Sequence, residues 1–182
     1  MKKPQQIYDQ EIPDDDYKMA WGMERDKANV ESTKKWLYIG ADSRNPGYAK
    51  VGMTMGDMST RSTSTASPPY YLFCAFQLRH DIKKEQLKNI ENGAFAYLDG
   101  VFPGRREKHR ETQRLSECYY DIDFEDFFCH LHDYLYNNHH NHFLITGFDN
   151  GFGDVEGSAL AWHFNDLVSL QDRRRFIYMI LQ

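Results

Sequence analysis

Three features of the sequence predict an α+β fold, in which a small mixed or antiparallel β-sheet is flanked by helices. Apolar runs of strand length lie at residues 36–40, just before Gly52, and at 70–78. Residues 83–102 instead repeat their apolar side chains at helical spacing, which is typical of a helix with one buried face. Glycine, proline and asparagine cluster between these segments, where they indicate turns.

The first two strands are expected to form a β-hairpin. The run from Trp36 to Gly40 contains a tyrosine, and a second run ends at Gly52. Between them, Asn45-Pro46-Gly47 predicts an open loop of several residues. Because side chains alternate between the two faces of a strand, pairing would let Tyr38 and Lys50 project from one face.

A helix is expected to begin at Gly56-Asp57, directly after this hairpin. It would carry Arg61 close to Tyr38 and Lys50, so that a phenol, an ammonium and a guanidinium come together. Such a group suits phosphodiester chemistry, because cations stabilise negative charge on phosphoryl oxygens.

The third strand and the next helix follow from their apolar patterns. Residues 70–78 are dense in aromatic and apolar side chains and predict a central strand. In the helix over 83–102, Glu91 lies at the margin of the apolar stripe, where a carboxylate would point along the seam between helix and sheet. Gly93 weakens this helix by about 1 kcal/mol relative to alanine. It either marks the close approach of another backbone or is simply tolerated.

The last third of the chain is predicted to add further helices and strands. A short strand is expected at 117–122, and an aromatic amphipathic helix at 124–136 with Asp123 as its N-cap. Beyond a Gly/Asp turn, the pattern predicts a helix over 156–170 and a closing strand over 176–181.

Three regions result from these patterns. Residues 1–35 are an N-terminal extension, which the charged run at 14–16 predicts to be partly disordered. Residues 36–122 form the core, and residues 123–182 form a helical and strand extension packed on it. At 182 residues the chain is long enough to bury a hydrophobic core of its own.

Composition favours a cytoplasmic protein without a membrane partner. No apolar run is long enough to span a bilayer, and no apolar signal region follows Lys2-Lys3. Cys74, Cys118 and Cys129 are odd in number and scattered, which argues for reduced thiols rather than a disulfide framework. The oligomeric state cannot be predicted from these features.

The net charge of −5 is unevenly distributed along the chain. Residues 1–49 carry 8 basic and 9 acidic groups, 50–114 carry 11 and 7, and 115–182 carry 3 and 11. The positive excess is densest in a loop after Gly104, where a nucleic-acid backbone would make first contact. The alternative is a solvated loop in an acidic protein. The predicted nucleic-acid contacts in this loop are Arg105, Arg106, Lys108 and Arg110.

The order of these residues resembles the GIY-YIG nuclease superfamily, and most closely its phage and bacterial branch, whose second motif reads Lys-x-Gly-x-Thr. Trp36-Leu37-Tyr38 takes the place of the first motif, and Lys50 to Thr54 takes the place of the second. Arg61 and the helical Glu91 then follow in family order. The resemblance covers residues 36–121.

The resemblance implies a metal-dependent DNA endonuclease, with RNA not excluded as a substrate. Tyr38 would be the general base toward water, its phenol pKa lowered by the metal and neighbouring cations. Lys50 would supply such a cation, and Arg61 would hold the scissile phosphate. Glu91 would ligate a single divalent ion, Mg²⁺ or Mn²⁺, with water completing the coordination shell.

The chain departs from the family pattern at three positions. Trp36 replaces the glycine of the first motif, and Lys50 replaces the tyrosine of the second. Ala94 or Phe95 stands where this branch often carries a histidine. One alternative is therefore a GIY-YIG-like scaffold that holds nucleic acid or a protein without cleaving it. Another is an acidic partner-binding protein whose last third mimics nucleic acid.

Two other groups of residues have the composition of metal sites. Between Cys129 and His142 the chain concentrates cysteine and histidine, the ligands that zinc prefers, but their spacing matches no closed four-ligand pattern. A surface cluster is therefore favoured there. The segment from Asp149 to Asp154 has the acids and glycines of a calcium loop without its spacing or terminal glutamate, so a turn is favoured.

Overall fold

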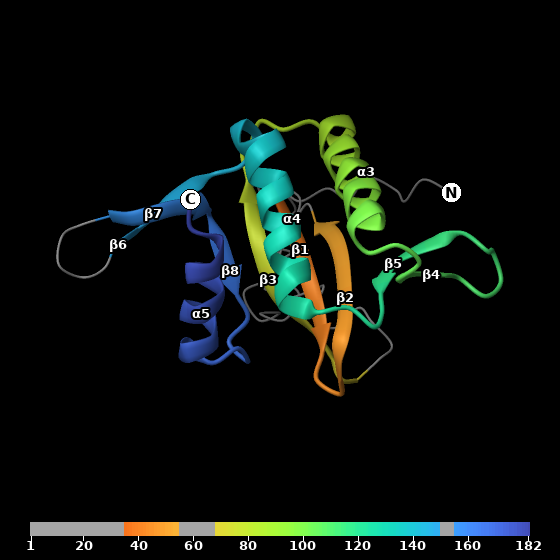
Figure 1. Ribbon diagram of the computed structural model, residues 1–182. Coiled ribbons are helices and arrows are strands. Elements are labelled where there is room, and N and C mark those ends of the chain that lie inside the picture. The colour runs from red at the N-terminus through yellow and green to blue at the C-terminus, as the bar shows by residue number, and fades with distance from the viewer. Residues whose placement is uncertain (1–34, 55–67, 150–154) are drawn as a thin grey trace, which may run out of the picture.

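The α+β fold is confirmed by the computed structural model, which describes residues 35–54, 68–149 and 155–182. Within these ranges the chain forms an antiparallel sheet of six strands, a separate two-stranded sheet and three α-helices (Figure 1). The N-terminal extension, the expected helix start at Gly56-Asp57 and the predicted site residue Arg61 lie outside the described residues.

The six strands lie in the order β4-β5-β2-β1-β3-β8, and every neighbouring pair is antiparallel. Their bounds are Lys35–Asp42 for β1, Asn45–Thr54 for β2, Tyr70–Leu78 for β3, Arg106–Lys108 for β4, Leu115–Tyr119 for β5 and Trp162–Phe164 for β8. The second sheet pairs β6, Ile145–Asp149, with β7, Val155–Leu160.

The helices α3, Lys84–Val101, and α4, Phe124–His139, lie side by side on one face of the large sheet (Figure 1). The helix α5, Leu170–Ile180, packs near β8, and a short 3₁₀ turn, His140–His142, follows α4. The predicted helices over 83–102 and 124–136 are thereby confirmed, although α4 continues to His139. None of the helices in the described ranges is long and apolar enough to cross a membrane.

Asp123 caps α4 as predicted, because its side chain accepts a hydrogen bond from the backbone N–H of Asp126 at 3.0 Å. A β-carbon built at Gly93 of α3 would meet the hydroxyl of Tyr134 on α4. The neighbour is the end of a side chain, so the predicted close approach of another backbone is wrong.

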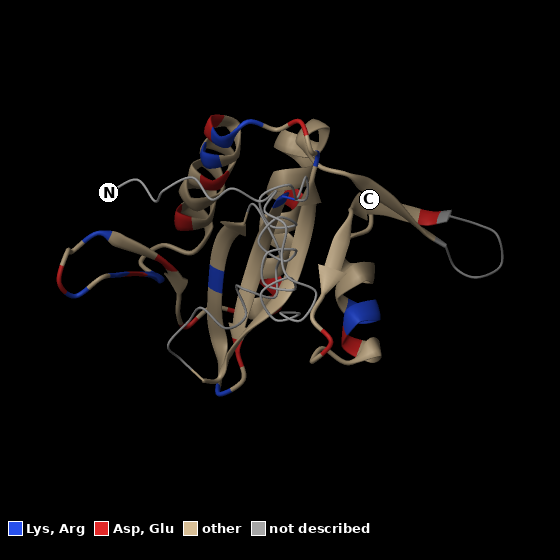
Figure 2. Ribbon diagram, turned by 180° about the vertical axis from the view of Figure 1, so that it is seen from behind, with Lys and Arg blue, Asp and Glu red and all other residues tan. Residues whose placement is uncertain are grey.

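The core lies between the large sheet and the helices. Leu37, Ile39 and Val51 point to this side and are completely buried, and one continuous cluster runs from β1 to α5. Alternation along β1 places Trp36 and Tyr38 on the opposite side, in a separate cluster. We call this second side, which carries Tyr38, Lys50 and Gly52, the motif face; Figure 2 views the sheet from it, with α3 and α4 behind.

The turn between β1 and β2 is tighter than predicted. Ser43 and Arg44 alone connect the strands, and Asn45-Pro46-Gly47 belongs to β2 instead of an open loop. A carboxylate oxygen of Asp42 accepts hydrogen bonds from the backbone N–H groups of Arg44, at 2.8 Å, and Asn45, at 3.2 Å. This side chain stabilises the turn locally, as aspartate often does before a reversal of the chain.

The predicted order of elements near the C-terminus is wrong. Residues 155–164 form strands β7 and β8 instead of a helix, and residues 170–180 form a helix instead of a strand. Within α5, Phe176, Ile177 and Ile180 are buried while the intervening side chains are exposed, which is a helical period hidden in a continuous apolar run. Ser169 marks the helix start, because its hydroxyl accepts the N–H of Asp172 at 3.0 Å.

Candidate active site

The pairing of β1 with β2 brings two predicted site residues onto one face of the sheet. Tyr38 lies opposite Gly52, and Gly40 lies opposite Lys50. Residues directly opposite each other in an antiparallel pair point to the same face, so Tyr38 and Lys50 both belong to the motif face. The prediction that the two strands pair and that Tyr38 and Lys50 share a face is confirmed by this pairing.

Two tyrosine rings on the motif face each lie over a glycine. The Tyr38 hydroxyl would be 2.6 Å from a β-carbon built on Gly52, and the ring of Tyr70 would collide with a β-carbon on Gly40. The glycine of the second motif is therefore required for space, because only a residue without a side chain leaves room for the phenol. Tyr38 is 4% exposed, so its ring is held closely.

Lys50 lies between an aromatic ring and a carboxylate. Its Nζ is 5.7 Å from the centre of the Tyr70 ring and 3.6 Å from Oε2 of Glu117 on β5. Only 19% of the Lys50 side chain is exposed. A cation over a ring face is attracted by the negative π-surface, so both neighbours stabilise the ammonium group.

Glu91 lies on α3 and is half-buried, at the margin of the helix face that packs on the sheet. Burial, and then the charge of Glu117, raise the pKa of the Glu91 carboxyl to about 7, while Lys88 and Arg106 act in the opposite direction. Glu91 belongs to a helix on the core side of the sheet, and Lys50 belongs to the motif face. The structure therefore places Glu91 on the opposite side of the sheet from Tyr38 and Lys50. Glu117 forms an ion pair with Lys50, and its negative charge adds to the raised pKa of Glu91.

Sequence reasoning missed Tyr70 and Glu117 as neighbours of the predicted site. Tyr70 was recognised only as the start of a strand, and Glu117 only as part of the strand after the basic loop. Gly40 is the sequence signal that could have indicated Tyr70, because a glycine in a strand leaves room for a neighbouring ring. For Glu117 there is no local signal, since its position depends on the pairing of β5 with β2.

The basic loop after Gly104 is a β-hairpin made by β4 and β5, and it projects from the side of the sheet (Figure 1). Its cations differ in how they are bound. Arg106 donates to Asp99 Oδ2 at 2.9 Å and to the backbone oxygen of Ser116 at 2.6 Å, and its guanidinium lies 4.0 Å from the centre of the Phe95 ring. These contacts hold the hairpin against α3.

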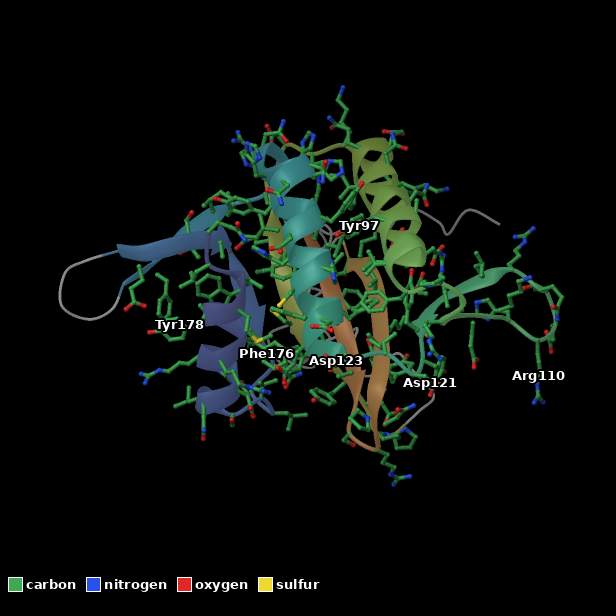
Figure 3. All side chains as sticks on the ribbon, in the orientation of Figure 1. Tyr97, Arg110, Asp121, Asp123, Phe176 and Tyr178 are labelled. Atoms are coloured by element: carbon green, nitrogen blue, oxygen red, sulfur yellow. The ribbon has the colours of Figure 1, made fainter. Side chains whose placement is uncertain are left out.

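The other cations of the hairpin are more exposed. Arg105 forms a solvent-exposed ion pair with Asp121, in which Nη1 lies 3.5 Å from Oδ2. Lys108 and Arg110 are exposed and form no ion pair within the described residues. Arg110 lies at the tip of the hairpin, far from the helices (Figure 3), and acidic residues are interspersed with the basic ones along it (Figure 2).

The histidines after Cys129 do not form one surface cluster. His132 is completely buried, and its Nε2 accepts a hydrogen bond from the backbone N–H of Leu160 at 3.3 Å while Nδ1 lies 3.2 Å from Asp133. Burial lowers the pKa of His132, so a neutral ring joins α4 to β7. The surface prediction is wrong for this residue, because it faces the core side of α4.

Metal-ligand clusters of three or more His, Cys, Asp or Glu side chains are absent from the ranges that the structure describes. The segment from Asp149 to Asp154 lies mostly outside those ranges. The three cysteines are free thiols, as their scattered positions predicted.

Comparison of the chain with protein-family models, with curated proteins and with solved structures finds no match. The site must therefore be interpreted from its own residues and geometry.

Proposed function

We propose that this protein is a divalent-metal-dependent DNA endonuclease of the GIY-YIG type. The observation that carries the proposal is the register of β1 and β2, in which Tyr38 lies over Gly52 and shares the motif face with Lys50. A phenol and an ammonium group on one face of a sheet are suited to the general-base and charge-stabilising parts of phosphodiester hydrolysis.

Each residue has one role in this proposal. The phenolate oxygen of Tyr38 accepts a proton from the attacking water. The ammonium group of Lys50 stabilises negative charge on the phosphoryl oxygens. Arg61, which lies outside the described residues, holds the scissile phosphate with its planar fork of donors.

Glu91 and the neighbouring Glu117 would supply carboxylate oxygens to a hard divalent cation, although the described residues contain no group of three or more ligating side chains and Lys88 and Arg106 also act on Glu91. A half-buried carboxylate whose pKa is raised by burial and by a second carboxylate gains from a nearby positive charge. Carboxylate oxygens are the ligands that Mg²⁺ and Mn²⁺ prefer, and Mg²⁺ usually keeps several waters. When bound, the ion would act as a Lewis acid toward the phosphoryl oxygen. Glu91 would hold it.

The β4–β5 hairpin is the proposed contact with the DNA backbone. Lys108 and Arg110 extend into solvent, and Arg105 is only loosely paired, so all three can reach phosphates. Arg106 was included in the prediction, but its donors already bind Asp99 and Ser116, so it supports the hairpin in this proposal. RNA carries the same phosphate groups, so these contacts would suit it as well. The free cysteines suit the reducing cytoplasm.

Supercoiled plasmid incubated with and without Mg²⁺ tests this function. The parental protein should nick or linearise the plasmid only with the metal. Glu91→Ala should abolish cleavage while the protein stays folded, as judged by circular dichroism. Glu85→Ala is the matched control, because Glu85 is an exposed carboxylate on the same helix, and it should cleave like the parent.

Two outcomes would change the conclusion. Full activity of Glu91→Ala would remove Glu91 from the site. If the parental protein binds DNA without cutting it under any divalent metal, the alternative of a non-cleaving GIY-YIG-like scaffold replaces the nuclease.

A further inference from the structure

We propose that Glu117 is a positioning residue, which acts together with the ring of Tyr70 to hold the Lys50 ammonium group in place for phosphate. This inference rests on the proposed nuclease function and extends it to two residues that no sequence motif contains. Glu117 acts through Lys50 and is not itself required to touch the substrate.

The contacts around Lys50 restrict a side chain that is flexible by nature. A lysine has four rotatable bonds and loses much rotamer freedom when it is held in one place. Here the ammonium lies 3.6 Å from Glu117 and 5.7 Å from the centre of the Tyr70 ring, and the side chain is largely covered. Groups placed in advance contribute more to a reaction than groups that must be ordered during it.

The pairing of β5 with β2 brings Glu117 close to Lys50. Ala49 lies opposite Tyr119 and Lys50 opposite Cys118, so Glu117 directly precedes the partner of Lys50. Alternation along β5 puts Glu117 on the same side as Tyr119, and its carboxylate reaches the Lys50 ammonium at 3.6 Å. The strand is also held on its other side, because Arg106 donates to the backbone oxygen of Ser116 at 2.6 Å.

Among the described residues, Glu117 is the only acidic side chain that forms an ion pair with Lys50. Half of the Glu117 side chain is exposed, so the pair by itself contributes little to the stability of the fold. The Lys50–Glu117 ion pair stabilises the fold only a little, but it involves a proposed catalytic cation. Its role is therefore better explained as orientation of the Lys50 ammonium group. The expected effect of losing it therefore lies in turnover.

Single-turnover cleavage of duplex DNA with Mg²⁺ tests the inference through a double-mutant cycle. The variants are Glu117→Gln, Lys50→Met and the combination of both. Glu117→Gln should lower the rate at saturating DNA by about tenfold with little change in DNA affinity, as expected for a misplaced catalytic group. Lys50→Met should lower it further, and adding Glu117→Gln to Lys50→Met should have no additional effect.

Two controls make the cycle decisive. Glu117→Asp keeps the charge and should recover part of the rate. Glu85→Gln makes the same charge change at an exposed position of α3 and should cleave like the parent.

The possible results separate this inference from the proposed function. If the parent cleaves and Glu117→Gln cleaves equally fast, the positioning role is overturned while the nuclease stands. Independent, multiplicative losses from Glu117→Gln and Lys50→Met would equally overturn it. If the parent itself does not cleave, the nuclease proposal fails and the positioning role fails with it.

Discussion

The two faces of the six-stranded sheet differ in chemical character although the same strands supply both. On the side of α3 and α4, Leu37 and Val51 are completely buried in the main core. On the motif face, Tyr38, Lys50 and Gly52 present a phenol, a cation and a position without a side chain. Alternation along β1 and β2 produces this difference, because successive residues point to opposite faces.

The difference separates stability from chemistry at adjacent positions. Side chains on the core side are expected to stabilise the fold by removing apolar area from water. On the motif face, the Tyr38 hydroxyl and the Lys50 ammonium are expected to matter mainly for the proposed reaction, while the ring of Tyr38 also packs in the smaller buried cluster there. Substitutions that differ by one position along a strand therefore test whether the two faces have different roles.

The largest effect is expected for Tyr38→Phe, which keeps the ring over Gly52 and removes the hydroxyl. Loss of a general base typically lowers turnover by about 10²- to 10⁴-fold. DNA affinity should change little, because the packing of the ring is retained. Cleavage rates at saturating DNA, together with a binding titration, measure the effect. Cleavage at the parental rate would exclude the hydroxyl as the base.

Leu37→Ala, one position earlier, is the contrasting control. Leu37 is completely buried on the core side, and truncation of such a leucine typically costs about 2–5 kcal/mol. Urea unfolding should detect this loss, while the cleavage rate per folded molecule should stay within a few-fold of the parent. A selective loss of turnover in this variant would contradict the separation of the two faces.

Gly52→Ala should have the next largest effect, by displacing Tyr38. The new β-carbon would lie 2.6 Å from the Tyr38 hydroxyl, so the ring must move. A shift of about 1 Å in a catalytic group can cost roughly 10²-fold in rate. Gly100→Ala is the matched control, because nothing lies within 4 Å of a β-carbon there, and it should leave cleavage unchanged. Equal rates for the two variants would show that Gly52 is not needed for space.

A smaller effect concerns the pH dependence of stability in the absence of metal. The pKa of Glu91 is raised from 4.5 to about 7 in the folded protein, so the folded state binds a proton more tightly than the unfolded state. Ionisation of Glu91 therefore destabilises the fold as pH rises between these two values, and the cost is fully present above pH 7.

Glu91→Gln should remove this cost. In urea unfolding with EDTA, the free energy of unfolding of the variant should exceed that of the parent by about 1 kcal/mol at about pH 8 and should equal it at about pH 4. The difference at high pH is small because Glu91 is partly exposed to solvent. Glu85→Gln, at an exposed position, should show no such gain. A Glu91→Gln variant whose stability tracks the parent at every pH would contradict the burial of this carboxylate.

The smallest effects are expected outside both faces, in the hairpin. Lys108→Ser and Arg110→Ser should each flatten the dependence of log affinity on log salt by about 0.9 for duplex DNA, without changing sequence preference. Arg106→Ser should instead lower the free energy of unfolding, because its hydrogen bonds to Asp99 and Ser116 are lost. An unchanged salt slope in the first two variants would favour the solvated-loop interpretation and the acidic partner-binding alternative.

Features that depend on local period and spacing are predicted correctly from the sequence. Alternation predicted that Tyr38 and Lys50 share a face, and the register of β1 and β2 confirms it. The helical period over 83–102 and the cap at Asp123 predicted α3 and α4. In each case the signal lies within one element or between strands that follow each other directly, where chain connectivity restricts the alternatives.

Features that depend on the pairing of distant segments become visible only in the folded structure. The pairing of β5 with β2 joins segments some 70 residues apart, as the contact of Tyr48 with Cys118 illustrates, and it places Glu117 beside Lys50. The apolar run at 176–181 is compatible with a strand or a helix until packing selects one, and burial of Phe176 and Ile180 selects the helix. Short local patterns leave such choices open, because the free energy that settles them comes from contacts with the rest of the fold.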